Sequence, residues 1–155
     1  MAERIYLDHQ ATTPTDRRVV ERMLPYFTEV YGNAASKDHA FGLEAKRAVD
    51  EARRHVAELI GAHEDEVVFT SGATEANNLA LLGVMERHVG RGDHLVTAVT
   101  EHKAVLDAAR ELERRGRRVT YLSVDGHGRV DPDDVRQAIT PRTVLVSVMA
   151  ANNEI

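Results

Sequence analysis

Cysteine is absent from this chain of 155 residues, which excludes disulfides, thiolate metal sites and a cysteine nucleophile within it. Lysine is scarce and occurs only at Lys37, Lys46 and Lys103. No run approaches the roughly 18 apolar residues of a membrane span, and the start "MAERIYLDHQ" lacks the features of a signal peptide. The net charge of −5 disfavours nucleic acid as a direct partner. These absences predict a cytoplasmic protein that binds no membrane.

The hydrophobic pattern predicts an α/β fold with a mainly parallel sheet flanked by helices, because strand patterns alternate with helical ones. Helices are expected over residues 14–30, 41–60, 74–88 and 104–115, with a short one capped by Asp131, and strands over 67–70, 95–99, 119–124 and 144–149. The apolar run "VLVSVM" suits a central strand buried on both faces.

Three polar segments follow predicted strands: "SGATEANN", "TEHKAV" and "AANNEI". Ligands of parallel sheets gather beyond the carboxyl ends of the strands. We therefore expect these segments, although distant in sequence, to share a site at one edge of the sheet.

The stretch "VVFTSGATEANNLALLG" passes from a β-branched run through a glycine turn into a helix. Such a turn directs unpaired amides and the positive end of the helix dipole at one point, where Ser71 and Thr74 add hydroxyl donors. The pattern indicates either a phosphate site or a helix capped by Ser71 or Thr74. The two common nucleotide loops, GxGxxG and GxxxxGK[ST], are both missing from the stretch.

Two further polar positions have a functional and a structural interpretation. His102 begins a helix just after a strand, so it is either an exposed helix-start residue or a group that stacks on a ring and exchanges protons. Asn152 and Asn153 follow the strand over 144–149, where they either form a turn or donate hydrogen bonds to a ligand.

Several stretches together resemble the N-terminal part of a cysteine desulfurase of the NifS/IscS type. They occur in family order and are "IYLDHQATTP", "GNAASKDHAFG", "VVFTSGATEANNLALLG", "TEHKAVLDAARELERRG", "VTYL" and "TVLVSVMAANNEI". The resemblance implies a fold-type-I enzyme of the class V aminotransferase family that depends on pyridoxal 5'-phosphate (PLP). It implies an N-terminal arm over 1–14 and the first part of the PLP-binding large domain over 15–155.

The resemblance also assigns roles to single residues. Ala73 and Thr74 match the positions that bind the cofactor phosphate, and Asn152 matches the asparagine near the ring hydroxyl. His102 matches the histidine that stacks on the pyridine ring and takes part in proton transfer, so it is the candidate catalytic residue.

The implied activity removes sulfur from L-cysteine, with PLP as the electron sink. A thiolate of the enzyme attacks the substrate sulfur and leaves L-alanine and an enzyme persulfide. The implied partners are an iron–sulfur scaffold or another sulfur acceptor, including tRNA-thiolation pathways, and a second copy of the enzyme in a homodimer.

Three parts of the family's machinery are not in this chain. The cofactor-linking lysine, the aspartate at the pyridine nitrogen and the catalytic cysteine lie downstream of "NNEI" in the family. The sequence therefore predicts a fragment that is inactive alone. Lys103 is expected not to be the cofactor lysine, because "TEHKAVL" matches the ring-stacking segment. Ala150 stands where many relatives have histidine, which we expect to alter the pocket.

Two rival functions remain open on the sequence. One is another enzyme of the class V aminotransferase type, such as a selenocysteine lyase. The other is a truncated, non-catalytic interaction module.

Overall fold

The computed structural model describes residues 4–9, 11–152 and 154–155. The chain divides into two compact units, Met1–Phe69 and Thr70–Ile155. No helix in the described part of the chain is both long and apolar enough to cross a membrane.

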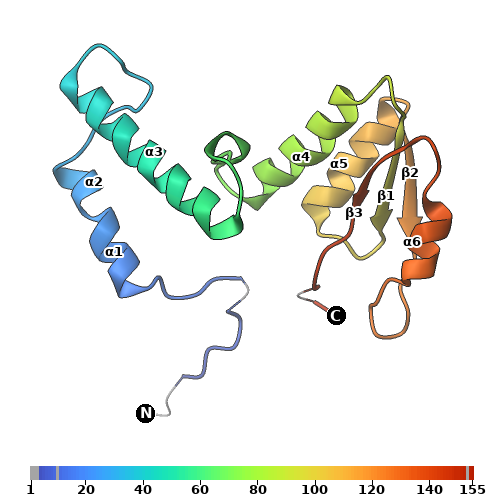
Figure 1. Ribbon diagram of the computed structural model, residues 1–155. Helices are drawn as coiled ribbons and strands as arrows, with labels where there is room; N and C mark the ends of the chain where they lie inside the picture. Colours follow the sequence, from blue (N-terminus) through green and yellow to red (C-terminus); the bar gives the residue numbers. More distant parts are fainter. Residues whose placement is uncertain (1–3, 10, 153) are drawn as a thin grey trace. The chain divides into compact units, whose positions relative to one another are not determined.

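The first unit is helical: α1 spans Arg17–Met23, α2 Pro25–Thr28, α3 Ala40–Ile60, and a 3-10 turn covers Glu64–Glu66 (Figure 1). The single helix predicted over 14–30 is wrong, because the structure divides it between α1 and α2. Pro25 explains the division, since it has no N–H to continue the α1 ladder and instead opens the first turn of α2.

Helix α3 has a histidine at its start and a glycine at its end. The Nδ1 atom of His39 accepts the Gly42 amide at 3.1 Å, so His39 caps the helix. Gly61 ends it in the left-handed conformation with φ 68°. The helix predicted over 41–60 is confirmed within one residue.

Residues 67–70 are extended but form no strand, so the strand predicted there is wrong. The Arg53 guanidinium donates to the carbonyl oxygen of Val67 and lies 4.8 Å from the ring centroid of Phe69. Val68 is 64% exposed. β-branched residues favour a strand only where a neighbouring strand pairs with them, and no such neighbour exists among the described residues of this unit.

The second unit is an α/β arrangement that confirms the predicted fold class. Its elements are α4 (Ala73–Arg87), β1 (His94–Ala98), α5 (Lys103–Arg114), β2 (Arg118–Leu122), α6 (Pro132–Ala138) and β3 (Thr143–Ser147). The strands lie in the order β2-β1-β3 and both pairings are parallel. Helices α4 and α5 lie against each other, and side chains from both form the core with β1 (Figure 1).

The centre of this sheet is β1 rather than β3. All five residues of β1 are buried, whereas Val146 of β3 is 39% exposed. The prediction that "VLVSVM" forms the centre is therefore wrong in this structure. The reason is that β1 pairs along both edges, whereas β3 has one pairing neighbour among the described residues.

Candidate functional site

The carboxyl edge of the sheet lies where helices α4 and α5 begin (Figure 1). The loop after β1 holds Thr100, Glu101 and His102, and the segment after β3 holds Met149 and Asn152. The second and third of the predicted segments thus meet at this edge.

The turn before α4 leaves its first amides open. Gly72 is the N-cap, has no side chain to cap the helix, and a Cβ built there would meet no heavy atom within 4 Å. Within the described ranges, no acceptor binds the amides of Ala73 and Thr74. Free amides at the positive end of a 15-residue helix fit an anionic group such as a phosphate.

Ser71 does not cap the helix, and its hydroxyl donates to Glu75. Its amide and its hydroxyl both donate to Oε2 of Glu75, at 2.6 and 2.7 Å. These hydrogen bonds hold the pKa of Glu75 below its ordinary value. Neither Ser71 nor Thr74 caps the helix, because the N-cap is Gly72. The Ser71 hydroxyl is therefore engaged in this structure, and the amides of Ala73 and Thr74 are the donors that face outward.

His102 is the N-cap of α5. Its Nδ1 atom accepts the Ala104 amide at 3.1 Å, and the side chain is exposed. Because Nδ1 is the acceptor, the proton of the neutral ring lies on Nε2, which points to no partner in the described residues. The structural interpretation of His102 is thus correct, and the same contact leaves one face and one nitrogen for a ligand.

Asn152 lies on the segment after β3 and is held from two directions. Its Nδ2 atom donates to the carbonyl oxygen of Thr100 at 2.7 Å, and its Oδ1 atom accepts the Glu154 amide at 2.6 Å. The second bond is a side-chain turn typical of asparagine. Asn153, the other predicted asparagine, falls outside the described residues.

Glu101 is a site residue that the sequence analysis missed. Its side chain is 7% exposed, and Oε1 accepts the Met149 amide at 2.5 Å. Burial raises the pKa of this carboxyl group. The available signal was a carboxylate one residue before His102 and three residues after the end of a fully buried strand. Charged side chains are seldom buried unless a partner compensates them.

A cavity of about 530 Å³ lies at this edge, between the ends of β1 and β3 and the loop after β2. Asn152, Thr100 and Met149 line it, together with His127 and Arg129. His102 and Thr74 do not line it. Among the described residues no hydrogen bond joins Ala73 or Thr74 to His102 or Asn152, so the structure links the second and third predicted segments directly and the first only by its place at the same edge.

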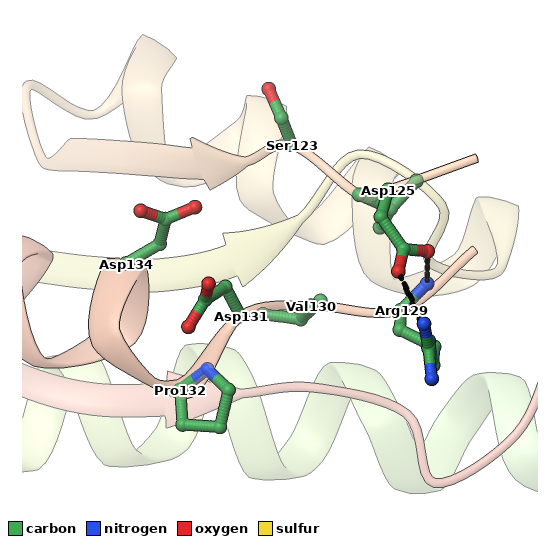
Figure 2. A pocket seen from close by; sticks show the side chains of 8 residues that line it. Ser123, Asp125, Arg129, Val130, Asp131, Pro132 and Asp134 are labelled. Atoms are coloured by element: carbon green, nitrogen blue, oxygen red, sulfur yellow. Dashed lines mark hydrogen bonds and ion pairs between the residues drawn. The ribbon is translucent and has the colours of Figure 1, made fainter. Parts of the chain in front are cut away.

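A second pocket of about 480 Å³ lies after β2, and its acidic residues have structural roles (Figure 2). Asp125 forms an ion pair with Arg129 at 3.0 Å and accepts the amides of His127 and Arg129. Asp131 caps α6 by accepting the Asp133 amide at 2.8 Å, which confirms its predicted capping role. These carboxylates shape a loop and a helix start.

Lys103 lies on the surface beside this site. Its side chain is 79% exposed and forms an ion pair with Asp107 one turn later on α5. This placement agrees with the prediction that Lys103 does not serve the cofactor.

Comparison with known proteins identifies the family of this chain. Residues 5–155 match the aminotransferase class-V family. The chain belongs to that family. Enzymes of this family depend on PLP, so the predicted cofactor is the family's cofactor. The free amides of α4, the open nitrogen of His102 and the placement of Asn152 at one edge fit such an anionic, planar group.

Individual relatives agree with the family match. The chain is 59% identical over 150 residues to a protein of Anaeromyxobacter sp. (strain K) named cysteine desulfurase IscS, covering 97% of this chain and 37% of that protein. A solved structure of a NifS-like protein superposes with a TM-score of 0.91 at 40% identity, covering 99% of this chain and 42% of that chain. A structure of SspA in complex with cysteine superposes with a TM-score of 0.87 at 37% identity, covering 97% and 43%. The chain thus spans well under half the length of the class-V relatives that it matches.

Proposed function

We propose that the full-length protein containing this chain is a PLP-dependent cysteine desulfurase. It takes sulfur from L-cysteine and gives L-alanine and an enzyme persulfide. The observation that carries the proposal is the pairing of the His102 and Asn152 loops at the carboxyl edge of the sheet. It is supported by 59% identity to a protein named for this activity.

The residues of this chain have distinct tasks in that proposal. The amides of Ala73 and Thr74, with the Thr74 hydroxyl, bind the phosphate at the start of α4. His102 would pack against the ring, with Nε2 available to hold or release a proton. Asn152 lies beside the ring hydroxyl, oriented by its bonds to Thr100 and Glu154.

The cofactor supplies an electron sink for the bond changes of the substrate. The chain contributes binding and orientation around it. The sulfur acceptor, whether an iron–sulfur scaffold or another protein, the homodimer and a cytoplasmic location belong to this proposal and rest on the family resemblance.

The test uses the purified full-length protein. We expect a visible absorption band of bound PLP, and L-alanine with sulfide released from L-cysteine in the presence of a thiol. Thr74→Ala should mainly increase the loss of cofactor, and His102→Ala should mainly lower kcat. His55→Ala, which removes an exposed histidine of α3, is the matched control and should behave as the parent protein.

Two outcomes would contradict the proposal. Unchanged cofactor content and turnover in Thr74→Ala and His102→Ala would overturn the assignment of the site. Turnover of L-selenocysteine without turnover of L-cysteine would favour the selenocysteine lyase instead.

A further inference from the structure

Glu101 carries a buried carboxyl group that the proposed chemistry does not use. A carboxylate removed from water is costly unless hydrogen bonds or opposite charges compensate it. Within the described part of the chain, Glu101 forms no ion pair, and its compensation comes from the Met149 amide at 2.5 Å. Burial of this carboxyl group therefore adds little stability by itself, and what the group holds in place is the Met149 amide.

The contact joins two segments beyond the reach of the strand ladder. The pairing of β1 with β3 ends at Thr97 and Ser147. Past that point, Glu101 accepts from Met149, and Thr100 accepts from Asn152 at 2.7 Å. Two successive residues after β1 thus receive hydrogen bonds from two residues of the segment after β3, which fixes the spacing between the segments.

The proposed ring-binding side chains are adjacent to these two bonds. His102 follows Glu101 directly, and its ring is oriented by the Ala104 amide at 3.1 Å. Asn152 itself makes the second bond. The contact of Glu101 with Met149 and that of Thr100 with Asn152 therefore tie the loop of His102 to the segment of Asn152.

We propose that Glu101 is a positioning residue, whose carboxyl group holds the loop of His102 against the segment of Asn152 and so sets the spacing of the two groups that contact the cofactor ring. The inference rests on the proposed function and deepens it. Glu101 itself touches neither substrate nor cofactor in this role and acts through His102 and Asn152.

The test compares Glu101→Gln with Glu101→Met in the full-length protein loaded with PLP. Glutamine keeps a side-chain oxygen that accepts the Met149 amide, whereas methionine fills a similar volume and accepts no comparable bond. Replacing a buried carboxylate with an apolar group of similar volume is compatible with folding. The readouts are the absorption maximum of bound PLP, the rate of PLP release, and kcat and KM for L-cysteine, with the melting temperature as a check of folding.

We expect the Gln variant to keep the parent's absorption maximum and PLP release rate. We expect the Met variant to shift the absorption maximum and to lower kcat by about 10- to 100-fold, with a smaller change in KM, because the reacting groups are displaced. If the Met variant does not fold, Glu101→Asp shortens the side chain by one methylene, which draws the carboxylate away from the Met149 amide and should cause the same changes to a smaller extent.

A double variant separates positioning from a general structural role. If Glu101 acts through His102, adding Glu101→Met to His102→Ala should lower kcat little further, since coupled residues are not additive. Fully multiplied losses, or parent-like behaviour of the Met variant, would overturn the inference. A parent protein that bound no PLP would instead overturn the proposed function, so the two failures are distinguishable.

Discussion

The two ends of the sheet hold histidines in opposite situations. At the amino end, His94 of β1 is 6% exposed, and its two ring nitrogens lie 2.8 Å from the Thr143 hydroxyl and 2.9 Å from the Thr120 hydroxyl. At the carboxyl end, His102 is exposed and has one nitrogen engaged. A ring with both nitrogens bonded joins three strands, whereas a ring with one open nitrogen is able to serve a ligand.

The acidic residues at the two ends differ in the same way. Asp93 receives Arg142 at 2.7 Å and Arg118 at 3.1 Å, and these guanidinium groups hold its pKa well below the ordinary value. Burial raises the pKa of Glu101, which bonds only to a backbone amide among the described residues. At the amino end, the charge of Asp93 is therefore compensated by two guanidinium groups. At the carboxyl end, the Glu101 carboxyl group has only a backbone amide as its partner among the described residues.

The largest effect is expected from a change that disturbs both ends together. Leu95 is the second residue of β1, has no exposed surface and packs in the core with α4 and α5. Leu95→Ala should lower the free energy of unfolding by about 2–5 kcal/mol, because it leaves a cavity. Denaturant unfolding of the full-length protein measures this. A loss below that range would show that the two ends do not depend on a shared core.

A paired change should separate the two ends. His94→Ala leaves two threonine hydroxyls without their partner and should cost about 1–3 kcal/mol of folding stability. At temperatures where the protein stays folded, His94→Ala should change the affinity for PLP little. His102→Ala removes the side-chain cap of α5 and should cost about 0.5–2 kcal/mol of folding stability. Unlike His94→Ala, it should also lower kcat and speed the release of PLP. Melting curves and PLP release rates of both variants test this difference. Equal effects of the two variants on PLP release would show that His94 and His102 do not differ in their relation to the cofactor.

A smaller, pH-dependent effect is expected at Asp93. Because its folded-state pKa is lowered, Asp93 contributes stability that is complete above the ordinary value of 3.8 and is lost progressively as the pH falls from that value through the lower pKa of the folded state. The Asp93→Asn variant should therefore have a lower melting temperature than the parent at pH 7. The difference in melting temperature should narrow towards roughly pH 3, because Asp93 of the parent begins to be protonated there. Asp65→Asn, at an exposed aspartate of the 3-10 turn, is the control. A difference in melting temperature that stays constant with pH would show that the ion pairs of Asp93 do not stabilise the fold.

Much of the second unit could be predicted from the sequence, because its signals are local. The helix over 104–115 and the strand over 95–99 match α5 and β1 within one residue, since apolar periodicity decides them. The Asp131 cap could also be predicted, as capping depends on neighbouring residues.

The errors arose where partners distant in sequence decide the outcome. Residues 67–70 have a strand composition but no pairing strand, and the central place in the sheet depends on which strand has two neighbours. At the site, the positions of His102 and Asn152 could be singled out by residue type. The bond from Met149 to Glu101 could not, because it joins residues 48 positions apart through a backbone amide.

The smallest effect is expected one residue from the candidate catalytic histidine. Lys103 is exposed and paired with Asp107 on the same helix, and exposed pairs of this kind add little stability. Lys103→Ala should leave the melting temperature, the PLP content and kcat at parent values. If the cofactor is bound by a lysine other than Lys103, as the family resemblance implies, treatment of the PLP-loaded variant with borohydride should still attach the cofactor covalently. Loss of that covalent labelling in Lys103→Ala, with folding intact, would make Lys103 the cofactor lysine and would place the reacting centre on α5 itself.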